Sequence, residues 1–278
     1  MNKGSGPVVL RRRVGITLRA LRMKAGVTPQ QAADVIRSHP SKISRMENGQ
    51  SPLRERDVCD LLDLYGLAGG PERNALLDDV RAASRPTWWQ RYRDTVPSWE
   101  LAYLGLETDA SQIRCYAPYT VPDLLQTDSY AAALRGGSHL RAQAARLSEL
   151  RATRQELVRR PGRALWAVID ESALLRPAGG RDIMREQIAS LITAAKTPGV
   201  AIQVLRLSAG AWQGGGTAFT LLRFGDPALP EVVYTETPVS GGYTDRAEDV
   251  DQYRYLADRL GITAEPCAAT PDILAALL

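Results

Sequence analysis

The sequence holds few of the residues from which metal centres and nucleophilic sites are built. Only two histidines, His39 and His139, and three cysteines, Cys59, Cys115 and Cys267, occur among its 278 residues. The cysteines are widely separated, so they show no metal-ligand spacing and are too few for a disulfide framework. We expect them to be reduced and mostly buried, and we predict no metal site and no bound cofactor.

Signatures of catalysis are also missing. The chain contains no HExxH, GxSxG or CxxC pattern, and neither histidine has a companion for acid-base work. The nearest acidic constellation is Asp170 and Glu171 with Glu107 elsewhere, and adjacent residues of a strand point to opposite faces. We expect these acids to pair with arginines. The sequence therefore predicts no catalytic residues, and a protein that is not an enzyme.

Long apolar runs are absent as well. No stretch approaches the roughly 20 apolar residues that span a bilayer. No apolar run that could serve as a secretion signal follows Lys3. These absences predict a cytoplasmic protein without membrane contact.

Acidic residues are nearly absent from the first 45 positions. That stretch holds ten lysines and arginines but a single acid, Asp34, so it carries +9 where the whole chain carries +4. Residues 46–278 therefore carry −5. A basic head on a mildly acidic body is the electrostatic pattern expected when one end meets nucleic acid. The length of the chain also favours two domains over one.

A helix-turn-helix is predicted over residues 26–50. Gly26 ends an upstream helix, the Thr28 side chain is placed to cap the next helix, and Pro29 suits a first-turn position that loses no hydrogen bond. Apolar residues then recur at three- and four-residue spacing, and the pattern breaks over residues 37–39. Those three residues form the turn.

The second helix of this motif is predicted over residues 40–48. Ile43 and Met46 face inward, whereas the outward face is short, polar and basic. A recognition helix needs such side chains to reach base edges and phosphates in the major groove. The alternative is an ordinary helical hairpin within a bundle. We predict that double-stranded DNA is contacted by Thr28, Gln30, Ser41, Lys42, Ser44, Arg45 and Asn48, and by Arg13 in the preceding helix.

The triplet Gly26-Val27-Thr28 and the run SKISRMENG at 41–49 are very similar to the lambda-repressor-like, or XRE-type, DNA-binding domain. The resemblance implies a structural ion pair between Arg22 and Glu47. Helical patterns after Ser51-Pro52 and over about residues 71–84 complete the five helices of such a domain.

The chain departs from the pattern of this family at two positions. Pro29 replaces a glutamine that normally opens the second helix and grips a phosphate, and Arg37 replaces the usual glycine of the turn. Arg37 is therefore expected to adopt a left-handed conformation, unless the turn is remodelled.

Aromatic residues become frequent after Pro86, where eight of the seventeen in the chain lie within 43 residues. Such rings either pack a core or a dimer contact, or they line a pocket for a ligand or a partner. The candidates for such a pocket are Trp88, Trp89, Trp99, Tyr103 and Tyr116. The motifs Pro97-Ser98-Trp99, Gly105-Leu106-Glu107 and Leu124-Leu125-Gln126-Thr127 resemble the C-terminal domain of many actinobacterial XRE-type regulators. That resemblance implies an antitoxin-like protein, often encoded beside a very small partner.

Helical and β-like patterns alternate in the remaining sequence. A charged helix is predicted over 138–160 and is a candidate for self-association, and helices are also predicted over 181–196, 249–260 and 271–278. Strands are predicted at 165–170, 201–207, 218–224 and 231–237. The first two strands should be parallel through a helical crossover, because a helix separates them. The later links are short enough for hairpins.

These patterns predict a mainly α protein with an α+β C-terminal domain. A five-helix head over residues 1–85 would bind an operator, and a helical and small mixed-sheet domain over 86–278 would sense a small-molecule effector or hold a partner and form a homodimer. The expected function is transcriptional regulation. The alternative is an antitoxin-like interaction protein that binds a small partner protein and autoregulates its own operon.

Overall fold

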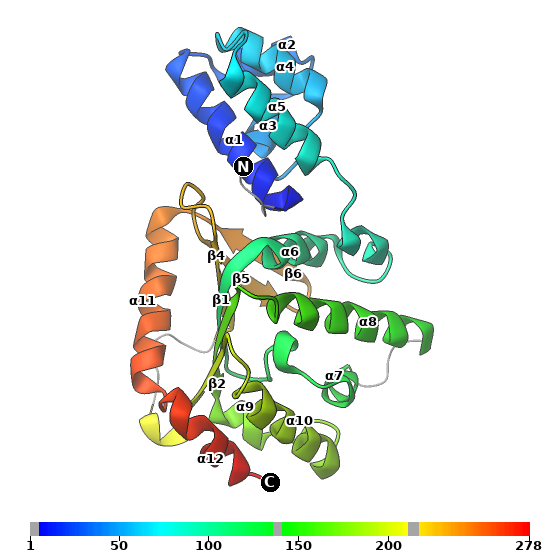
Figure 1. Ribbon diagram of the computed structural model, residues 1–278, viewed down its shortest axis with the longest axis vertical. Coiled ribbons are helices and arrows are strands. Elements are labelled where there is room, and N and C mark those ends of the chain that lie inside the picture. The colour runs from blue at the N-terminus through cyan, green and yellow to red at the C-terminus, as the bar shows by residue number, and fades with distance from the viewer. Residues whose placement is uncertain (1–5, 136–140, 211–216) are drawn as a thin grey trace. The chain divides into compact units, whose positions relative to one another are not determined.

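The computed structural model describes residues 6–135, 141–210 and 217–278 (Figure 1). Lys3 and His139 lie outside the described residues. The chain divides into two compact units. The first ends at Gln90 and includes the short segment 225–229, and the second comprises Arg91–Phe224 and Pro230–Leu278. The predicted fold class, mainly α with an α+β C-terminal part, is confirmed.

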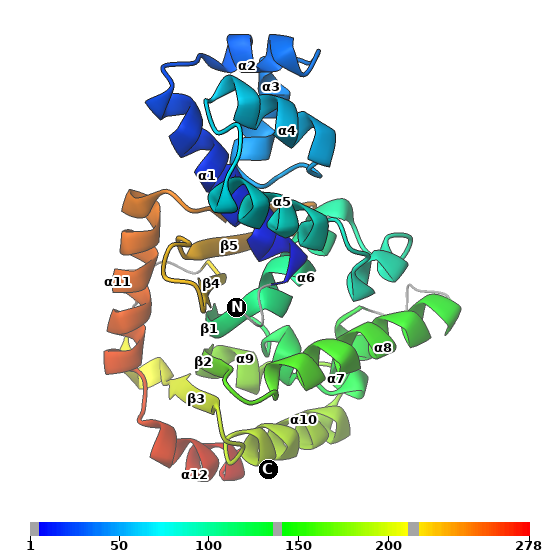
Figure 2. The same cartoon turned by 45° about the horizontal axis from the view of Figure 1, so that its top comes forward.

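Five helices form the first unit, which we call the head (Figure 2). They are α1 (Pro7–Lys24), α2 (Pro29–Val35), α3 (Pro40–Glu47), α4 (Glu55–Leu64) and α5 (Pro71–Ala83). Each contributes apolar residues to one buried cluster, made of Val14, Leu18, Ala32, Ala33, Ile43, Met46, Leu53, Val58, Leu61, Leu62, Tyr65, Leu76, Leu77 and Val80. The helix-turn-helix is thus α2 and α3, held on a common core with the other three helices.

The first four helices of the head end in the same way. After α1, α3 and α4 the chain turns through a glycine with positive φ, at Gly26, Gly49 and Gly66. At α2 the equivalent position is Arg37, whose φ is 50°. Its amide donates to Asp34 O, and the next amide, of Ser38, donates to Ala33 O, which is the Schellman pattern. The expected left-handed conformation of Arg37 is confirmed.

Helix α1 approaches the last turn of α3 very closely. A Cβ atom added at Gly15 would lie 2.5 Å from the carbonyl oxygens of both Met46 and Glu47. The Arg22 guanidinium binds the Glu47 carboxylate through Nε at 2.6 Å and through a second nitrogen at 3.0 Å, and it also donates to Val27 O. The ion pair implied by the resemblance is therefore formed, and both side chains are largely buried.

The second unit is built on one six-stranded sheet with the order β3-β2-β1-β4-β5-β6. Its strands are β1 (Ala110–Ala117), β2 (Ala164–Asp170), β3 (Val200–Leu205), β4 (Phe219–Phe224), β5 (Val232–Thr237) and β6 (Ser240–Thr244). The first three run parallel, and the remaining pairs are antiparallel. The sheet is therefore mixed, as predicted.

Helices cover both faces of this sheet (Figure 1). They are α6 (Ser98–Asp109), α7 (Asp128–Leu134), α8 (Arg141–Val158), α9 (Glu171–Leu175), α10 (Arg181–Ala194), α11 (Ala247–Thr263) and α12 (Thr270–Ala275). The link from β2 to β3 passes through α9 and α10, which confirms the predicted crossover. Helix α11 packs on the face opposite α6 and α8, where its Val250, Ala257 and Leu260 join a buried cluster with Tyr116, Val168 and Phe219.

Three features of the sheet differ from the expectations. Strands β1 and β6 are not predicted by the sequence patterns, although β1 lies at the centre of the sheet. The hairpin expected between β3 and β4 is wrong, because β2 and β1 lie between them. The link from β4 to β5 does join antiparallel neighbours.

The leucines Leu150 and Leu157 of α8, the helix proposed for self-association, are buried within the unit.

The cysteines are all free, but they differ in exposure. Cys115 is buried, Cys59 is half-buried and Cys267 is exposed, so the expectation of mostly buried cysteines is wrong for Cys267. Across the described ranges, no three or more His, Cys, Asp or Glu side chains are grouped so as to hold a metal ion. None of the described helices has the length and apolar character needed to cross a membrane.

We expect Glu47→Ala to destabilise the head. The substitution leaves the Arg22 side chain, which is 13% exposed, without its carboxylate. Removing one partner of a buried ion pair costs about 3–5 kcal/mol. Hydrogen exchange of the α1–α5 amides in the full chain should show the loss of protection. Glu47→Gln keeps one acceptor oxygen and should cost less. Unchanged protection together with an altered base preference would mean that Glu47 reads DNA instead.

Candidate functional site

The outward face of α3 is polar and free of acidic side chains. Ser41, Ser44, Arg45 and the C-cap residue Asn48 are exposed, whereas Ile43 and Met46 point into the core of the head. Residues predicted to contact DNA from α2 are exposed too, namely Thr28 and Gln30. The structure therefore brings six of the eight predicted DNA-contacting residues onto the exposed surface of the helix-turn-helix.

Caps hold the two helices of this motif in place. The Thr28 hydroxyl accepts from the Gln31 amide, and the Gln31 side chain accepts from the Thr28 amide, so the pair forms a complete capping box. At the start of α3 the His39 ring accepts from the Ser41 amide at 3.2 Å. Sequence reasoning did not assign a role to His39. An imidazole is an unusual cap, and only its position before Pro40 could have suggested it.

The two cations of α3 differ in their surroundings. Lys42 Nζ lies 2.7 Å from Asp57 Oδ2 of α4, and the Lys42 side chain is 26% exposed. Arg45 is exposed, and within the part of the chain that the structure describes no carboxylate pairs with it. The Gln30 amide is also engaged, because it donates to Asp34 Oδ1 at 2.8 Å. Arg45 is therefore the cation of this face that needs no rearrangement to meet a phosphate or a base.

Arg13, unlike Arg45, is half-buried. Its Nε donates to Asp79 Oδ2 at 3.0 Å and a second nitrogen lies 2.5 Å from Oδ1, so α1 and α5 are joined by a two-point contact. A contact of this geometry is worth more than a single hydrogen bond and would have to break or be shared before Arg13 met DNA.

The five aromatic residues proposed as a pocket do not belong to one unit. Trp88 and Trp89 lie in a short 3₁₀ segment, η1 (Trp88–Tyr92), where their rings meet edge to face at 5.8 Å. Both belong to the first unit, whereas Trp99, Tyr103 and Tyr116 belong to the second. Tyr103 and Tyr116 line a cavity there, and Trp99 packs against Gly241 of β6.

That cavity is open and has a volume of about 830 Å³. It lies where β1 and β5 end and β4 begins, since residues at these strand ends line it. Five aromatic residues are among those that line it: Tyr103, Tyr116, Tyr119, Phe219 and Tyr234. Burial raises the pKa of the Cys115 thiol in this wall to about 12, so the sulfur stays protonated and unreactive.

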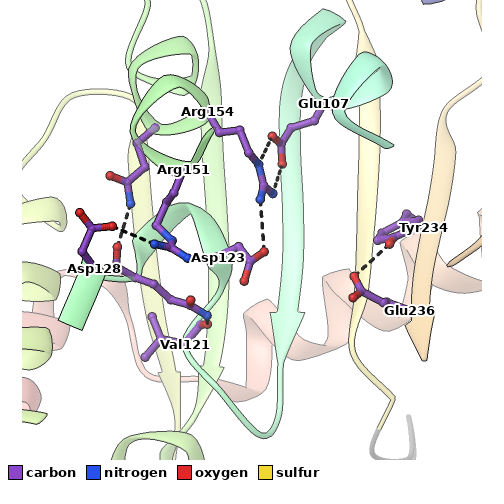
Figure 3. Close-up of polar contacts among 10 residues, drawn as sticks. Glu107, Val121, Asp123, Asp128, Arg151, Arg154, Tyr234 and Glu236 are labelled. Atoms are coloured by element: carbon purple, nitrogen blue, oxygen red, sulfur yellow. Dashed lines mark hydrogen bonds and ion pairs between the residues drawn. The ribbon is translucent and has the colours of Figure 1, made fainter. Parts of the chain in front are cut away.

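A buried arginine binds two carboxylates beside the cavity (Figure 3). Arg154 of α8 is 7% exposed and binds both oxygens of Glu107, each at 2.8 Å. A third nitrogen reaches Asp123 Oδ2 at 3.2 Å. Arg151, one turn earlier on the same helix, binds Asp128 at 2.8 Å. Glu107 and Arg154 were not named as a site by sequence reasoning, because their pairing joins positions far apart in the chain.

The remaining acids of this region pair as expected or serve as caps. Glu171 binds Arg206 at 3.3 Å and accepts from the Leu207 amide, whereas Asp170 caps α9 and accepts from the Tyr116 hydroxyl at 3.4 Å. Neither forms a carboxylate pair suited to acid-base work. The expectation that these acids meet arginines is confirmed for Glu107 and Glu171.

Two carboxylates near the cavity have no cation bound to them among the described residues. Glu236 accepts the Tyr234 hydroxyl at 2.9 Å (Figure 3), and no other described group forms a hydrogen bond or ion pair with it. Glu100, one turn before Tyr103 on α6, is half-buried, and no described residue forms a hydrogen bond or ion pair with it. Burial raises the pKa of Glu100 to about 7, although the charge of Arg154 opposes the rise.

We expect Glu100→Gln to stabilise the protein at pH 8 but not near pH 4. In the folded chain Glu100 holds its proton up to about pH 7, whereas the unfolded chain loses it near 4.5. The folded state therefore loses stability as pH rises from about 4.5 to 7, and the amide escapes that loss. Urea unfolding should show a gain of about 1–2 kcal/mol at pH 8, allowing for partial exposure.

The control for this experiment is Glu156→Gln, which removes an exposed carboxylate of α8. It should leave the free energy of unfolding unchanged at both pH values. Two results would contradict a raised pKa of Glu100. One is an equal gain in the free energy of unfolding for the two variants at pH 8, and the other is a gain for Glu100→Gln that persists at pH 4.

Comparisons with known proteins match two family models to the chain. A family model described as a helix-turn-helix domain matches residues 13–76, which contain α2 and α3. Neither a search of curated proteins nor a search of solved structures finds a match to the chain. A second family model, described as a domain of unknown function (DUF5753), matches residues 101–276, which is more than half of the chain. The protein therefore carries a helix-turn-helix domain followed by a domain of unknown function, and it belongs to the DUF5753 family.

Proposed function

We propose that the protein is a cytoplasmic, sequence-specific transcriptional regulator of the lambda-repressor-like, XRE type. Residues 1–85 bind a DNA operator and residues 86–278 sense a ligand or hold a partner and form the dimer. The observation that carries the proposal is the exposed face of α3, where Ser41, Ser44 and Arg45 are exposed and no described carboxylate binds Arg45. The match of residues 13–76 to a helix-turn-helix domain supports it.

The shape and charge of the head suit this role. An α-helix fits the major groove of B-DNA, where a guanidinium can donate to two acceptors of one guanine. Arg45 lies in the last turn of α3 and is exposed. The first 45 residues carry +9. That charge attracts DNA of any sequence, because phosphate contacts release counterions. Base contacts from α3 then supply the sequence preference.

Lys42 plays a smaller part than Arg45 in this proposal. Its ammonium group lies 2.7 Å from Asp57, so the charge is already partly neutralised when DNA arrives. The ion pair also joins α3 to α4 and thereby orients the recognition helix. Lys42 is thus expected to position α3 as much as to contact DNA.

Arg45→Ala should weaken binding to an operator selected from a pool of random duplexes by tenfold or more. A base-reading contact is worth about 1–3 kcal/mol. Lys42→Ala should weaken binding less, because the lysine is already paired. Gel shifts at one fixed salt concentration measure both variants. Arg85→Ala, an exposed arginine after α5, serves as the matched control and should bind like the parent chain. Equal affinities for the parent and Arg45→Ala would sink the assignment of α3 as the reading helix.

The proposed dimer follows from the geometry of DNA. Helix-turn-helix proteins read two half-sites about one helical turn apart, roughly 34–36 Å, so two heads must be held at a fixed separation. Most large apolar side chains of the described head are already in its core. The second unit exposes more of them, including Tyr255 and Ile262 on α11, which are 61% and 76% exposed. These two positions are seven residues apart and so share one face of the helix.

Sedimentation tests this part of the proposal. The full chain and a fragment of residues 86–278 should both be dimers at micromolar concentration. A fragment of residues 1–85, which has its own core, should be a monomer and should bind the operator more weakly. A monomeric 86–278 fragment would mean that pairing occurs through the heads or only on DNA.

A further inference from the structure

We propose that the cavity at the ends of β1 and β5 binds an organic cation, an amine or quaternary ammonium group carried on an apolar or aromatic body. The inference rests on the ligand-sensing part of the proposed function and names the ligand class and its site. It is carried by three features of the cavity: its place in the sheet, its aromatic wall and its excess of carboxylates.

The cavity lies where mixed sheets of this kind bind ligands. β5 runs parallel to β1, since each is antiparallel to β4, so the two strands end at the same edge. Ala117, Phe219 and Glu236 mark this edge, and all three line the cavity. Ligands of α/β sheets bind outside the carboxyl ends of the parallel strands. A volume of about 830 Å³ falls within the range of small-molecule sites.

Aromatic residues line the cavity, and Tyr119 is exposed at its rim, at 54%. The buried rings of Tyr103 and Tyr234 stack on each other with their centroids 4.2 Å apart, and the buried rings of Tyr116 and Phe219 belong to the cluster on the α11 face of the sheet. The face of an aromatic ring attracts a cation, most strongly when both groups are desolvated. An apolar body with a positive charge therefore fits this wall better than a neutral polar molecule does.

Charges around the cavity favour a cation over an anion. Four carboxylates interact with one another across this region: Glu100, Glu107, Asp123 and Glu236. The cations that face them are Arg154, Arg135 and Arg163, and Arg163 also faces Asp109. With Glu100 ionised, as at pH 8, these groups carry an excess of two negative charges.

Arg154 is not available to an incoming anion. Three of its nitrogens already donate to Glu107 and Asp123. Breaking these bonds would strand a buried charge, which is strongly unfavourable. Glu236, in contrast, is exposed, and among the described residues it is bound only by the Tyr234 hydroxyl, so its carboxylate can turn to a ligand without breaking a described ion pair.

The test compares two hydrophobic ions that have nearly the same size and opposite charge. Tetraphenylphosphonium and tetraphenylborate are titrated separately into the full chain at pH 8, without DNA, in a calorimeter. The phosphonium should bind with one ion per chain. Glu236→Gln should weaken this binding by about fivefold, which corresponds to the roughly 1 kcal/mol between two unit charges about 4 Å apart in water. Tyr119→Ala, which removes an exposed ring of the wall, should weaken it as well.

The matched control is Glu248→Gln in the first turn of α11, a residue that does not line the cavity. The Glu248 side chain is 88% exposed, and its substitution removes the same charge. It should leave the affinity for the phosphonium unchanged. Loss of affinity at Glu236 and Tyr119 but not at Glu248 supports the proposal.

Several outcomes would overturn the inference. These are failure of the phosphonium to bind, equal affinity for the parent and both cavity variants, or a borate affinity that falls in the Tyr119 variant and exceeds that of the phosphonium. If tetraphenylborate binds and neither cavity variant changes its affinity, the borate is bound by the basic head. The affinity for the phosphonium then decides the test. Because no DNA is present, this test can fail while Arg45 still reads an operator, and the reverse also holds.

Discussion

The backbone contact between Gly15 and the last turn of α3 is the constraint on which the presentation of α3, the proposed recognition helix, depends. Helix α3 has eight residues, too few to be stable in water without tertiary contacts. Its end is fixed from α1 by the close approach at Gly15 and by the Arg22–Glu47 pair. Its start is fixed by the His39 cap, and its middle is joined to α4 by Lys42. The exposed side chains of α3 are thus placed by contacts made on its other sides.

Much of the head could be predicted because its signals are local. The Thr28 cap, the first-turn prolines Pro29 and Pro40, and the glycine stops each act within four or five residues of chain. Even the departure at Arg37 could be foreseen, since a helix end of this pattern requires a left-handed residue whatever its type. The pairing of Lys42 with Asp57 could not be foreseen, because fifteen residues and a turn separate the two side chains.

The second unit was harder to predict, because its central strand is covered by distant helices. β1 alternates buried Ile113 and Cys115 with the polar residues Gln112 and Arg114. It therefore lacks the continuous apolar run that is typical of a central strand. Arg114 is tolerated there because α11 supplies Asp258 and because its guanidinium lies over the Trp166 ring. These partners stand 144 and 52 positions later in the chain. β6 was missed for another reason, since its two glycines carry no hydrophobic alternation.

The cavity shows the same division between local and distant information. Tyr103 and Tyr116 could be named from the aromatic richness of their segment, and both line it. The charges that give the cavity its character come from α6, α8, β5 and the segment after β1, so no spacing in the sequence links them. The tryptophans were named for their chemistry alone, and the fold placed them elsewhere.

The buried arginine connects the stability of the second unit with the chemistry of its cavity. Arg154 can be buried because Glu107 neutralises it through two hydrogen bonds, an arrangement that satisfies both groups inside the fold. Glu100 is then left beside further carboxylates, and its raised pKa reflects burial opposed by one already paired cation. A proton on Glu100 and a cation in the proposed site would relieve the same repulsion. The two are therefore thermodynamically linked, and ligand binding in this cavity should be coupled to pH near neutrality through the fold itself.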